Sequence, residues 1–492
     1  MYVGGVDIGT SGCKIVVYDE HGVMIQRQYR EYDVKRGGGL HEIDAEKIFS
    51  SVKEMIMSLD IKNIAAMAIT SFGETFIMLD EKDKPCACSM LYTDPRGRTE
   101  CAELSNRFGE EQLAYLTGTK PHEMYSLPKI MWVKNNLPQK YKKARHILCI
   151  QDYIVYMLTG VAQIDYSLAA RTACFDIENK CWAAKILDYC GIDEKLLSLP
   201  VPSGTIAGDI KPALAAELGV NGDLKIVSGC HDQIAALTGA NVFASGEAMD
   251  GTGTVECVPV VMDSVPEEFS LFEHGYSFAP HSNGKYVCYA LSYAGGATLK
   301  WFRDNFSARS YAQLDSEVPT EPTELLILPH FAGAATPYMD VSSKAAVMGL
   351  TFEHTKADLY KALMEGTAYE IAVNLEILEK CGIMPKSMIA AGGGARSDVW
   401  LQIKADVLGL PIAAIDEEEV GAAGTAYLAG REIGVYDEQM RLANIKRVFK
   451  PDKKKHGFYK KQLIKYKRIY QCAKGILSDE SVRRPSVAGE RC

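Results

Sequence analysis

The sequence lacks the features of a membrane, secreted or polyanion-binding protein. No apolar run approaches the ~20 residues that a transmembrane helix needs. The first residues show no basic segment followed by an apolar stretch, the mark of a secretory signal. The 63 acidic residues outnumber the 54 basic ones for a net charge of −9, whereas phosphate backbones are bound by a basic excess. We therefore expect a cytoplasmic protein that binds neither membranes nor nucleic acid.

Cysteine patterns typical of metal sites are also missing. The 14 cysteines include no Cys-x-x-Cys pair, and Cys86 and Cys88 have no His or Cys partner nearby at zinc-ligand spacing. A disulfide scaffold is not expected in so long a chain without an export signal. The cysteines are predicted to be reduced thiols that serve as small apolar residues.

Neither the P-loop nor the Rossmann fingerprint occurs, although Gly-rich turns are present. The turn Gly9-Thr10-Ser11-Gly12 stands between residues 3–8 and 14–18, both rich in β-branched side chains. It is therefore predicted to be the tip of a β-hairpin rather than the start of a helix. Such a turn can hold phosphate with its backbone N–H groups and its hydroxyls.

A second Gly/Thr turn follows about 240 residues later. Residues 251–254 lie between the short predicted strands 246–250 and 255–258. Each hairpin contains an Asp, and the repetition suggests two topologically similar domains that face each other with a nucleotide between them. Coincidence is the alternative, because Gly/Thr turns are common.

The rest of the chain alternates strands with helices, which predicts an α/β fold whose sheets are covered by helices. We place the domain boundary near residue 243, giving domains 1–243 and 244–477 and a disordered tail 478–492. Helices are predicted over 45–59, 356–380 and 421–430, from about 398 and near the C-terminus, and strands over 64–70, 76–79 and 387–391.

Two aspartates stand where a phosphoryl-transfer site would need them. Asp7 ends a buried strand beside the first turn and is predicted to organise Mg²⁺ through water, with turn capping as the alternative. Asp232 stands at the expected start of a helix, so it is either an N-cap or a catalytic base that accepts a hydroxyl proton. His231 is expected to orient its neighbours. Lys14 either reaches a phosphate or is an exposed strand lysine.

Taken in order along the chain, these motifs resemble those of the FGGY carbohydrate kinases. Residues 124–136 fit the first signature of that family at every defined position, and residues 345–365 fit the second apart from Leu363. Gly392-Gly393-Gly394-Ala395 also matches, and the resemblance runs from residue 7 to about residue 430. It implies two ribonuclease H-like domains of the actin-like ATPase fold, with MgATP in the cleft between them and a sugar or polyol deeper in the first.

The resemblance also implies roles for single residues. Asp232 would be the base and Gln233 would touch the substrate. The implied ATP contacts are Thr10, Ser11, Lys14, Thr252 and Gly253 at the phosphates, Gly296 and Lys300 along the pocket, and Gly394 and Asp398 at the adenosine end.

The residues expected to bind the sugar depart from known members. Glu74 and Thr75 resemble the glycerol kinase motif, but Gly73 stands where that motif has an arginine and Met124 where it has a tyrosine. The Met-His pair of xylulokinases is missing too. Glu74 is predicted to clamp adjacent hydroxyls and Asp94 to line the same pocket, with a surface ion pair as the alternative for each. Gly73 would leave open space, which favours a larger sugar than glycerol.

The leading hypothesis is an ATP-dependent kinase that phosphorylates a five- or six-carbon ketose or polyol. One alternative is an ATP-binding protein like actin or the Hsp70 chaperones, which lack the two signatures. The other is a catalytically silent sugar sensor, which the presence of both Asp7 and Asp232 disfavours. The sequence chooses neither the sugar nor the oligomeric state, and a homodimer is left open.

Overall fold

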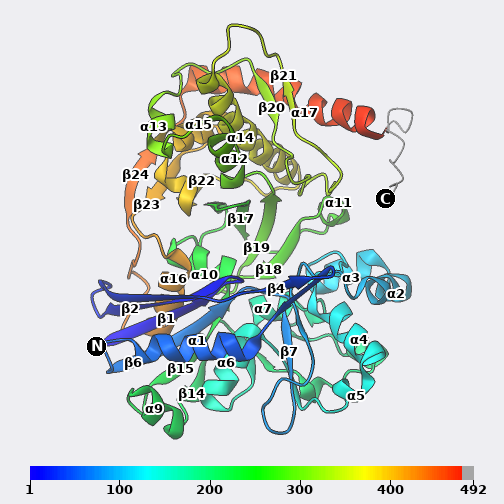
Figure 1. The fold of residues 1–492 in the computed structure, drawn as a ribbon, viewed down its shortest axis with the longest axis vertical. Coiled ribbons are helices and arrows are strands. Elements are labelled where there is room, and N and C mark those ends of the chain that lie inside the picture. The colour runs from blue at the N-terminus through cyan, green and yellow to red at the C-terminus, as the bar shows by residue number, and fades with distance from the viewer. Residues whose placement is uncertain (479–492) are drawn as a thin grey trace, which may run out of the picture. The chain divides into compact units, whose positions relative to one another are not determined.

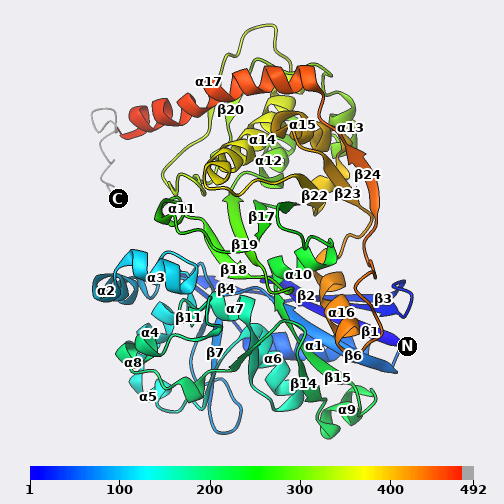
Figure 2. The same cartoon turned by 180° about the vertical axis from the view of Figure 1, so that it is seen from behind.

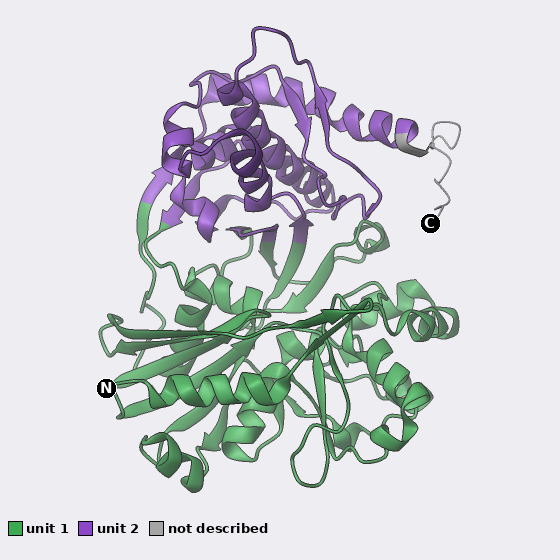
Figure 3. Ribbon diagram, in the orientation of Figure 1, with its two compact units in different colours: residues 1–249, 259–289, 415–446 green, residues 250–258, 290–414, 447–492 purple. Residues whose placement is uncertain are grey.

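The computed structural model describes residues 1–478 (Figures 1 and 2), so that residues 479–492 of the expected tail lie outside it. The chain forms two compact units, coloured in Figure 3. Unit 1 comprises residues 1–249, 259–289 and 415–446, and unit 2 comprises residues 250–258, 290–414 and the chain from residue 447. Within residues 1–478 no helix combines the length and the apolar character of a membrane span.

Unit 1 is built on a six-stranded sheet with the order β14-β15-β6-β1-β2-β3. The neighbours β15, β6 and β1 run parallel, and the remaining pairs are antiparallel. The strands are β1 (Tyr2–Ile8), β2 (Gly12–Asp19), β3 (Met24–Glu31), β6 (Ile64–Ser71), β14 (Ile206–Asp209) and β15 (Lys225–His231).

The first predicted hairpin is confirmed. Strands β1 and β2 pair antiparallel on either side of the Gly-rich turn, with Asp7 directly opposite Lys14. Because successive strand residues point to opposite faces, residues 13, 15 and 17 of β2 enter one hydrophobic cluster, and residues 16 and 18 enter another. The sheet is therefore buried on both sides.

Helices cover both faces of this sheet. On one face lie α1 (Ala45–Met57) and α6 (Ile150–Thr159), and the predicted apolar stripe of α1 is buried as expected. On the other face α16 (Val420–Glu432) packs its alanines against β1 and β2. Helix α10 (Asp232–Gly239) lies beside α16 (Figures 1 and 2).

Shorter elements complete unit 1. They are β4 (Lys35–Gly37), β5 (Leu40–Ile43), β7 (Phe76–Leu79), β8 (Ser89–Met90), α2 (Arg98–Phe108), α3 (Glu110–Thr117), α4 (Ser126–Asn136), α5 (Pro138–Tyr141), β9 (His146–Cys149), β10 (Gln163–Asp165), α7 (Tyr166–Ala170), β11 (Phe175–Asp176), β12 (Cys181–Trp182), α8 (Ala184–Cys190), β13 (Leu199–Val201), α9 (Pro212–Leu218) and α11 (Phe269–Glu273). The predicted strand at 76–79 is thus confirmed.

A second sheet has seven strands in the order β18-β19-β17-β16-β22-β23-β24. The neighbours β16 and β17 form the second predicted hairpin, and β22 pairs parallel with β23. The strands are β16 (Glu247–Thr252), β17 (Glu256–Met262), β18 (Ser277–Pro280), β19 (Tyr286–Ser292), β22 (Ser387–Ala391), β23 (Ile412–Ile415) and β24 (Ile445–Phe449).

The helices of unit 2 share one hydrophobic cluster with β20 (Leu326–Leu328), which pairs with β21 (Ala346–Met348). The predicted helices at 356–380 and from 398 are confirmed as α14 and α15, and the expected C-terminal helix is α17. The helices are α12 (Gly296–Phe306), α13 (Tyr311–Ser316), α14 (Lys356–Lys380), α15 (Asp398–Leu408) and α17 (Lys453–Ser478).

Glycines let the backbones of unit 1 approach each other closely. A Cβ atom at Gly5 of β1 would overlap the carbonyl oxygen of Ala422 in α16, and one at Gly424 of α16 would overlap the carbonyl oxygen of Ala235 in α10. These atoms belong to the main chain and not to flexible side chains, so the elements would have to separate. The position of α16 therefore depends on glycine at its contacts.

We expect Gly424→Ala to lower the melting temperature, because overpacking a close contact costs ~1–3 kcal/mol. The matched control is Gly457→Ala, at an exposed position of α17 where a Cβ meets no atom within 4 Å. That change should stabilise the protein by about 0.5–1 kcal/mol through helix propensity. Thermal unfolding of both variants measures the difference, and equal shifts would contradict this account of the packing.

Candidate functional site

The carboxyl ends of three adjacent strands bring the predicted site residues of unit 1 together. Strands β15, β6 and β1 are parallel neighbours, so their carboxyl ends lie along one edge of the sheet. Asp7 is near the end of β1, residues 72–75 follow β6, and Asp232 follows β15. Ligands of open α/β sheets bind at such an edge.

Asp7 lies among charged groups from several elements. Lys14 stands opposite it on β2, and the Nζ atom of Lys14 lies 2.8 Å from Oε2 of Glu419. A Cβ atom at Gly421, in the first turn of α16, would come within 2.9 Å of Oδ2 of Asp7. The pKa of the Asp7 carboxyl is raised to about 6, mainly by burial, while Lys14 lowers it and the nearby Asp232 and Glu419 raise it. A bound cation would relieve this cost of ionisation.

The first Gly-rich turn is held in place from one side. The N–H of Gly9 donates to the carbonyl of Gly12 across the turn at 2.9 Å. The Tyr32 hydroxyl donates to the carbonyls of both glycines, and the Tyr32 N–H donates to that of Ser11. Thr10 is half-buried and Ser11 is exposed.

Asp232 is the first residue of α10, and the N-cap position is occupied by His231. The N-cap alternative for Asp232 is therefore wrong. Burial raises the pKa of the Asp232 carboxyl to about 6, against Gln233 and Arg171, which lower it. Burial, together with Arg171, lowers the pKa of His231 to about 3, so its imidazole is neutral. The His231 N–H donates to the hydroxyl of Ser167 at 2.9 Å.

Glu74 has a strained backbone and forms a buried ion pair, whereas the alternative expected from the sequence was a surface one. Its φ angle of 65° is left-handed, and its carbonyl accepts the hydroxyl of Ser126, the first residue of α4, at 2.8 Å. Its carboxylate accepts Nε of Arg171 at 2.6 Å, and a second guanidinium nitrogen also pairs with it. Both side chains are nearly buried, so the pair is not a surface ion pair. Non-glycine strain of this kind is concentrated at functional sites.

Gly73 does not leave open space, and that expectation is wrong. A Cβ atom at this position would lie 2.9 Å from Cγ of Arg171 and 3.3 Å from Cδ2 of His231. The glycine is needed because the stem of Arg171 packs directly against it. An arginine thus reaches the neighbourhood of residue 73 from elsewhere in the chain.

Three buried polar atoms at this edge have no hydrogen-bond partner in the described residues. They are Oγ1 of Thr75, Nδ1 of His231 and Oδ1 of Asp232. The last lies 3.2 Å from Nε2 of His231 without forming a hydrogen bond. Because buried polar groups are nearly always paired, their clustering beside Glu74 and Arg171 indicates a place for a hydroxyl-bearing ligand.

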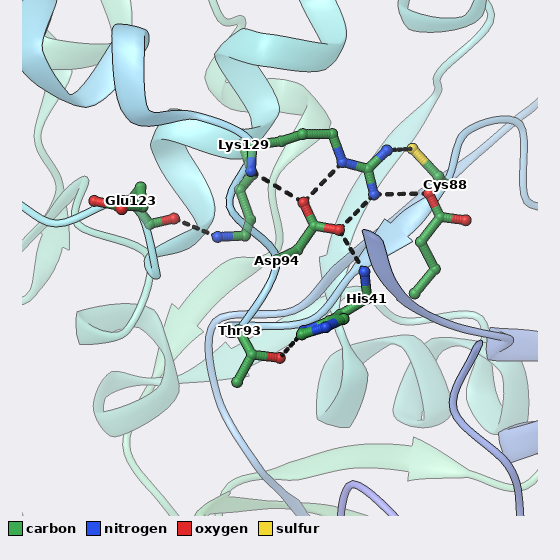
Figure 4. A network of polar contacts seen from close by, with 8 residues as sticks. His41, Cys88, Thr93, Asp94, Glu123 and Lys129 are labelled. Atoms are coloured by element: carbon green, nitrogen blue, oxygen red, sulfur yellow. Dashed lines mark hydrogen bonds and ion pairs between the residues drawn. The ribbon is translucent and has the colours of Figure 1, made fainter. Parts of the chain in front are cut away.

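Asp94 is already saturated within the protein (Figure 4). Its carboxylate accepts the N–H of His41 at 2.8 Å and three N–H groups of Arg96 at 2.7–3.0 Å. The guanidinium of Arg96 also pairs with Glu42 and lies 5.1 Å from the ring centroid of Trp132 in α4. Asp94 therefore anchors the α4 helix, a part of the first signature, to the loop after β8.

The predicted nucleotide residues of unit 2 converge on the end of β16. The N–H of Gly296 donates to the carbonyl of Gly253 at 2.8 Å. A Cβ atom at Gly394 would lie 2.6 Å from Cβ of Thr252, and one at Gly392 would lie 2.7 Å from the Thr252 carbonyl oxygen. Residues far apart in the sequence thus pack closely where only glycine fits.

A fully buried lysine supports this glycine cluster. Nζ of Lys404 in α15 lies 2.6 Å from Oδ2 of Asp250 and donates to the Thr252 hydroxyl at 2.7 Å. It also pairs with Glu256, whose pKa is raised by burial against the opposing charge of Lys404. The Thr252 side chain is thereby fixed, and the main chain of the turn remains for a ligand.

Lys300 and Asp398 are more peripheral than the other predicted nucleotide residues. Lys300 pairs with Asp304 on the surface of α12, and its side chain is 62% exposed. Asp398, the first residue of α15, pairs with Arg447 and is 58% exposed. These exposed pairs are weak and would not prevent either side chain from contacting a nucleotide.

Sequence reasoning missed Arg171 and Lys404. Each is a charged residue within an apolar run: Arg171 follows residues 168–170, and Lys404 lies one turn after Trp400 on the buried side of α15. A charge at a core position was the signal available, because such residues are almost never buried without a partner.

Comparison with known proteins gives a consistent result. The N-terminal domain of the FGGY family of carbohydrate kinases matches residues 2–239, and the C-terminal domain of that family matches residues 251–433. The chain is 28% identical to a xylulose kinase of Staphylococcus epidermidis, covering 96% of this chain and 97% of that protein. It is 26% identical to a gluconokinase of Bacillus subtilis, with coverage of 89% and 88%.

A solved structure of a ligand-bound xylulose kinase from Lactobacillus acidophilus superposes with a TM-score of 0.87. It is 25% identical and covers 97% of this chain and 99% of its own. The predicted α/β architecture with two actin-like ATPase domains is confirmed by this likeness and by the two sheets.

The raised pKa of Asp232 makes a prediction about stability. The folded-state pKa of about 6 exceeds the ordinary 3.8, so ionising Asp232 destabilises the folded protein. The free energy of unfolding therefore falls as the pH rises from about 4 to 6, and the whole loss is present above pH 6. Asp232→Asn should therefore melt a few degrees above the native protein at pH 8, with the gain vanishing near pH 4. The exposed Asp223→Asn is the control. A gain that is independent of pH would contradict the assignment.

Proposed function

The chain belongs to the FGGY family of carbohydrate kinases and is a phosphotransferase, and from this premise we propose that it transfers the γ-phosphate of MgATP to a hydroxyl of a five- or six-carbon ketose or polyol. The observation that carries the proposal is the group of unpartnered polar atoms around Asp232, beside Glu74 and Arg171. The substrate size follows the relatives, named xylulose kinase and gluconokinase, and no longer a gap at Gly73.

Asp232 is the proposed general base. The carboxylate, ionised above pH 6, accepts the proton of the attacking hydroxyl while the new O–P bond forms and the bond to ADP breaks. Glu74, Thr75 and Gln233 are the proposed substrate contacts. The hydrogen bonds of Asp94 are already used, so we propose that it supports the pocket through Arg96 and α4.

Asp7 is the residue proposed to serve Mg²⁺. Its carboxyl fits that role, because burial and neighbouring acids oppose its ionisation and a divalent cation would favour it. Within residues 1–478 no cluster of three His, Cys, Asp or Glu side chains could hold a metal. That suits Mg²⁺, which keeps several waters and takes one or two carboxylates plus substrate phosphates. The ion would neutralise charge on the transferring phosphate.

ATP is proposed to contact residues of both units. From unit 1 these are Thr10, Ser11 and Lys14, around the turn that Tyr32 holds. From unit 2 they are Thr252, Gly253, Gly296 and Gly394, together with Lys300 and Asp398. Because the Thr252 hydroxyl is engaged by Lys404, its contribution would come from the main chain, as in other anion-binding turns.

Release of ADP from ATP should depend on an added sugar. A screen over pentuloses, hexuloses, pentitols, hexitols and glycerol, with a coupled ADP assay, tests this directly. We expect one or a few five- or six-carbon compounds to exceed glycerol in kcat/KM. The same background rate with every compound would contradict the proposed kinase reaction.

Asp232→Asn should retain sugar and nucleotide binding but lower kcat by roughly 10²–10⁴-fold, the usual contribution of a positioned base. In the native enzyme log kcat should fall below about pH 6, where the carboxylate becomes protonated. Asp223→Asn should keep the native rate and profile. Near-normal turnover of Asp232→Asn, with binding intact by calorimetry, would remove Asp232 from the mechanism.

A further inference from the structure

Arg171 forms an ion pair with the proposed sugar contact Glu74 and acts electrostatically on the proposed base Asp232. It follows α7 directly, and its N–H donates to the carbonyl of Leu168 at 2.9 Å. The start of α7 is fixed by Asp165, whose carboxylate accepts the N–H groups of Ser167 and Leu168. The position of Arg171 is therefore set by a helix and not by a free loop.

The same helix also positions the proposed base. The hydroxyl of Ser167 accepts the His231 N–H at 2.9 Å, and Asp232 is the next residue. Arg171 and Asp232 are thus held by one short element. The guanidinium lowers the pKa of the carboxyl and opposes the burial that raises it.

The guanidinium itself is fixed on several sides. Its stem packs on Gly73, its centre lies 5.1 Å from the ring centroid of Tyr125, and its Nε atom donates to Oε1 of Glu74. A second nitrogen pairs with that same oxygen, so Oε2 of Glu74 lies outside the pair. Since the side chain of Arg171 is only 10% exposed, little rotamer freedom remains to be lost when a substrate binds.

A guanidinium donates hydrogen bonds only, and an ionised carboxylate accepts them only. Fixed side by side, they can bind two neighbouring hydroxyls, one that accepts from the guanidinium and one that donates to Oε2 of Glu74. We propose, resting on the proposed kinase function, that Arg171 is a specificity-determining residue that selects sugars with a vicinal diol and that acts as a matched pair with Gly73. An arginine from α7 thus supplies the donor that residue 73 lacks.

The first test is Arg171→Met, which keeps an apolar stem and removes the donors. Without the guanidinium no donor is left for the substrate hydroxyl, so kcat/KM for the best sugar should fall by on the order of 10²-fold or more. Arg171→Lys, which keeps the charge without the fork, should restore only part of the loss. Arg98→Met, at an exposed arginine paired with Glu123, is the control and should match the native protein.

Leaving Glu74 buried without its partner could unfold the protein, so a second variant is needed. Arg171→Met/Glu74→Gln removes both charges, and we expect it to fold with a native-like melting curve and still to lose the preference for the diol. In the native enzyme, a deoxy analogue lacking either hydroxyl should react far more slowly, because sites that bond a substrate hydroxyl reject analogues without it strongly. In the double variant the ratio of kcat/KM for the sugar to kcat/KM for the deoxy analogue should fall towards 1.

The matched pair is tested at Gly73. Gly73→Ala should displace Arg171 and raise the KM of the sugar, whereas Gly222→Ala, where a Cβ meets no atom within 4 Å, should not. Gly73→Arg should lower activity more strongly, and Arg171→Gly in the same chain should recover part of it. Failure of that second change to recover any activity in a folded protein would contradict the pairing.

Sugar-induced shifts in melting temperature separate this proposal from the kinase reaction. If the native protein releases no ADP with any sugar, the proposed function fails, but a sugar-induced shift that disappears in Arg171→Met still supports the role of Arg171. If kcat/KM and the sugar-induced shift of Arg171→Met stay within about threefold of the native values, Arg171 is not a specificity determinant and the inference is overturned.

Discussion

The close packing of α16 on β1 and α10 is the constraint on which the site in unit 1 depends. Gly5 and Gly424 remove the side chains that would hold these backbones apart. The contact fixes the beginning of α16, where Gly421 approaches the Asp7 carboxylate and Glu419 holds Lys14. Because α10 begins at Asp232, the same packing determines where the proposed base stands relative to the strand that carries Asp7. The chemistry of the edge therefore follows from contacts between backbones.

Ionising the two aspartates at this edge of the sheet costs free energy. Burial raises the pKa values of both Asp7 and Asp232 to about 6, so each is harder to ionise than an ordinary aspartate. The fold limits this cost with Lys14 and Arg171, which favour the ionised forms. In unit 2 the buried cation Lys404 is instead compensated by direct ion pairs with Asp250 and Glu256. There the ion pairs fix a turn, whereas in unit 1 they leave carboxylate oxygens for a ligand.

The sequence was sufficient for features that depend on local pattern. The hairpin around residues 9–12, the apolar stripe of α1 and the limits of α14 follow from periodicity and turn residues, and the ordered signatures led to the correct family. What it could not reveal depends on tertiary contacts. Asp232 was a candidate N-cap because it begins a helix, but the cap is His231, one residue earlier. Asp94 proved to be saturated by Arg96, its neighbour in the same loop, together with His41 of β5, which is distant in the sequence.

The expectation for Gly73 shows most clearly where prediction from the sequence fails. A motif comparison asks which residue stands at one position, and the missing arginine there suggested an empty pocket. A pocket, however, is defined by the atoms that reach it, and an arginine side chain is long enough to reach the same place from a different element. Gly73 is glycine because the stem of Arg171 packs where a Cβ atom would have to be. The guanidinium of Arg171 in turn donates to the carboxylate of Glu74, the residue after Gly73. Substrate preference in this family should therefore be inferred from the groups that converge in space, because the same donor can be supplied from more than one position in the sequence.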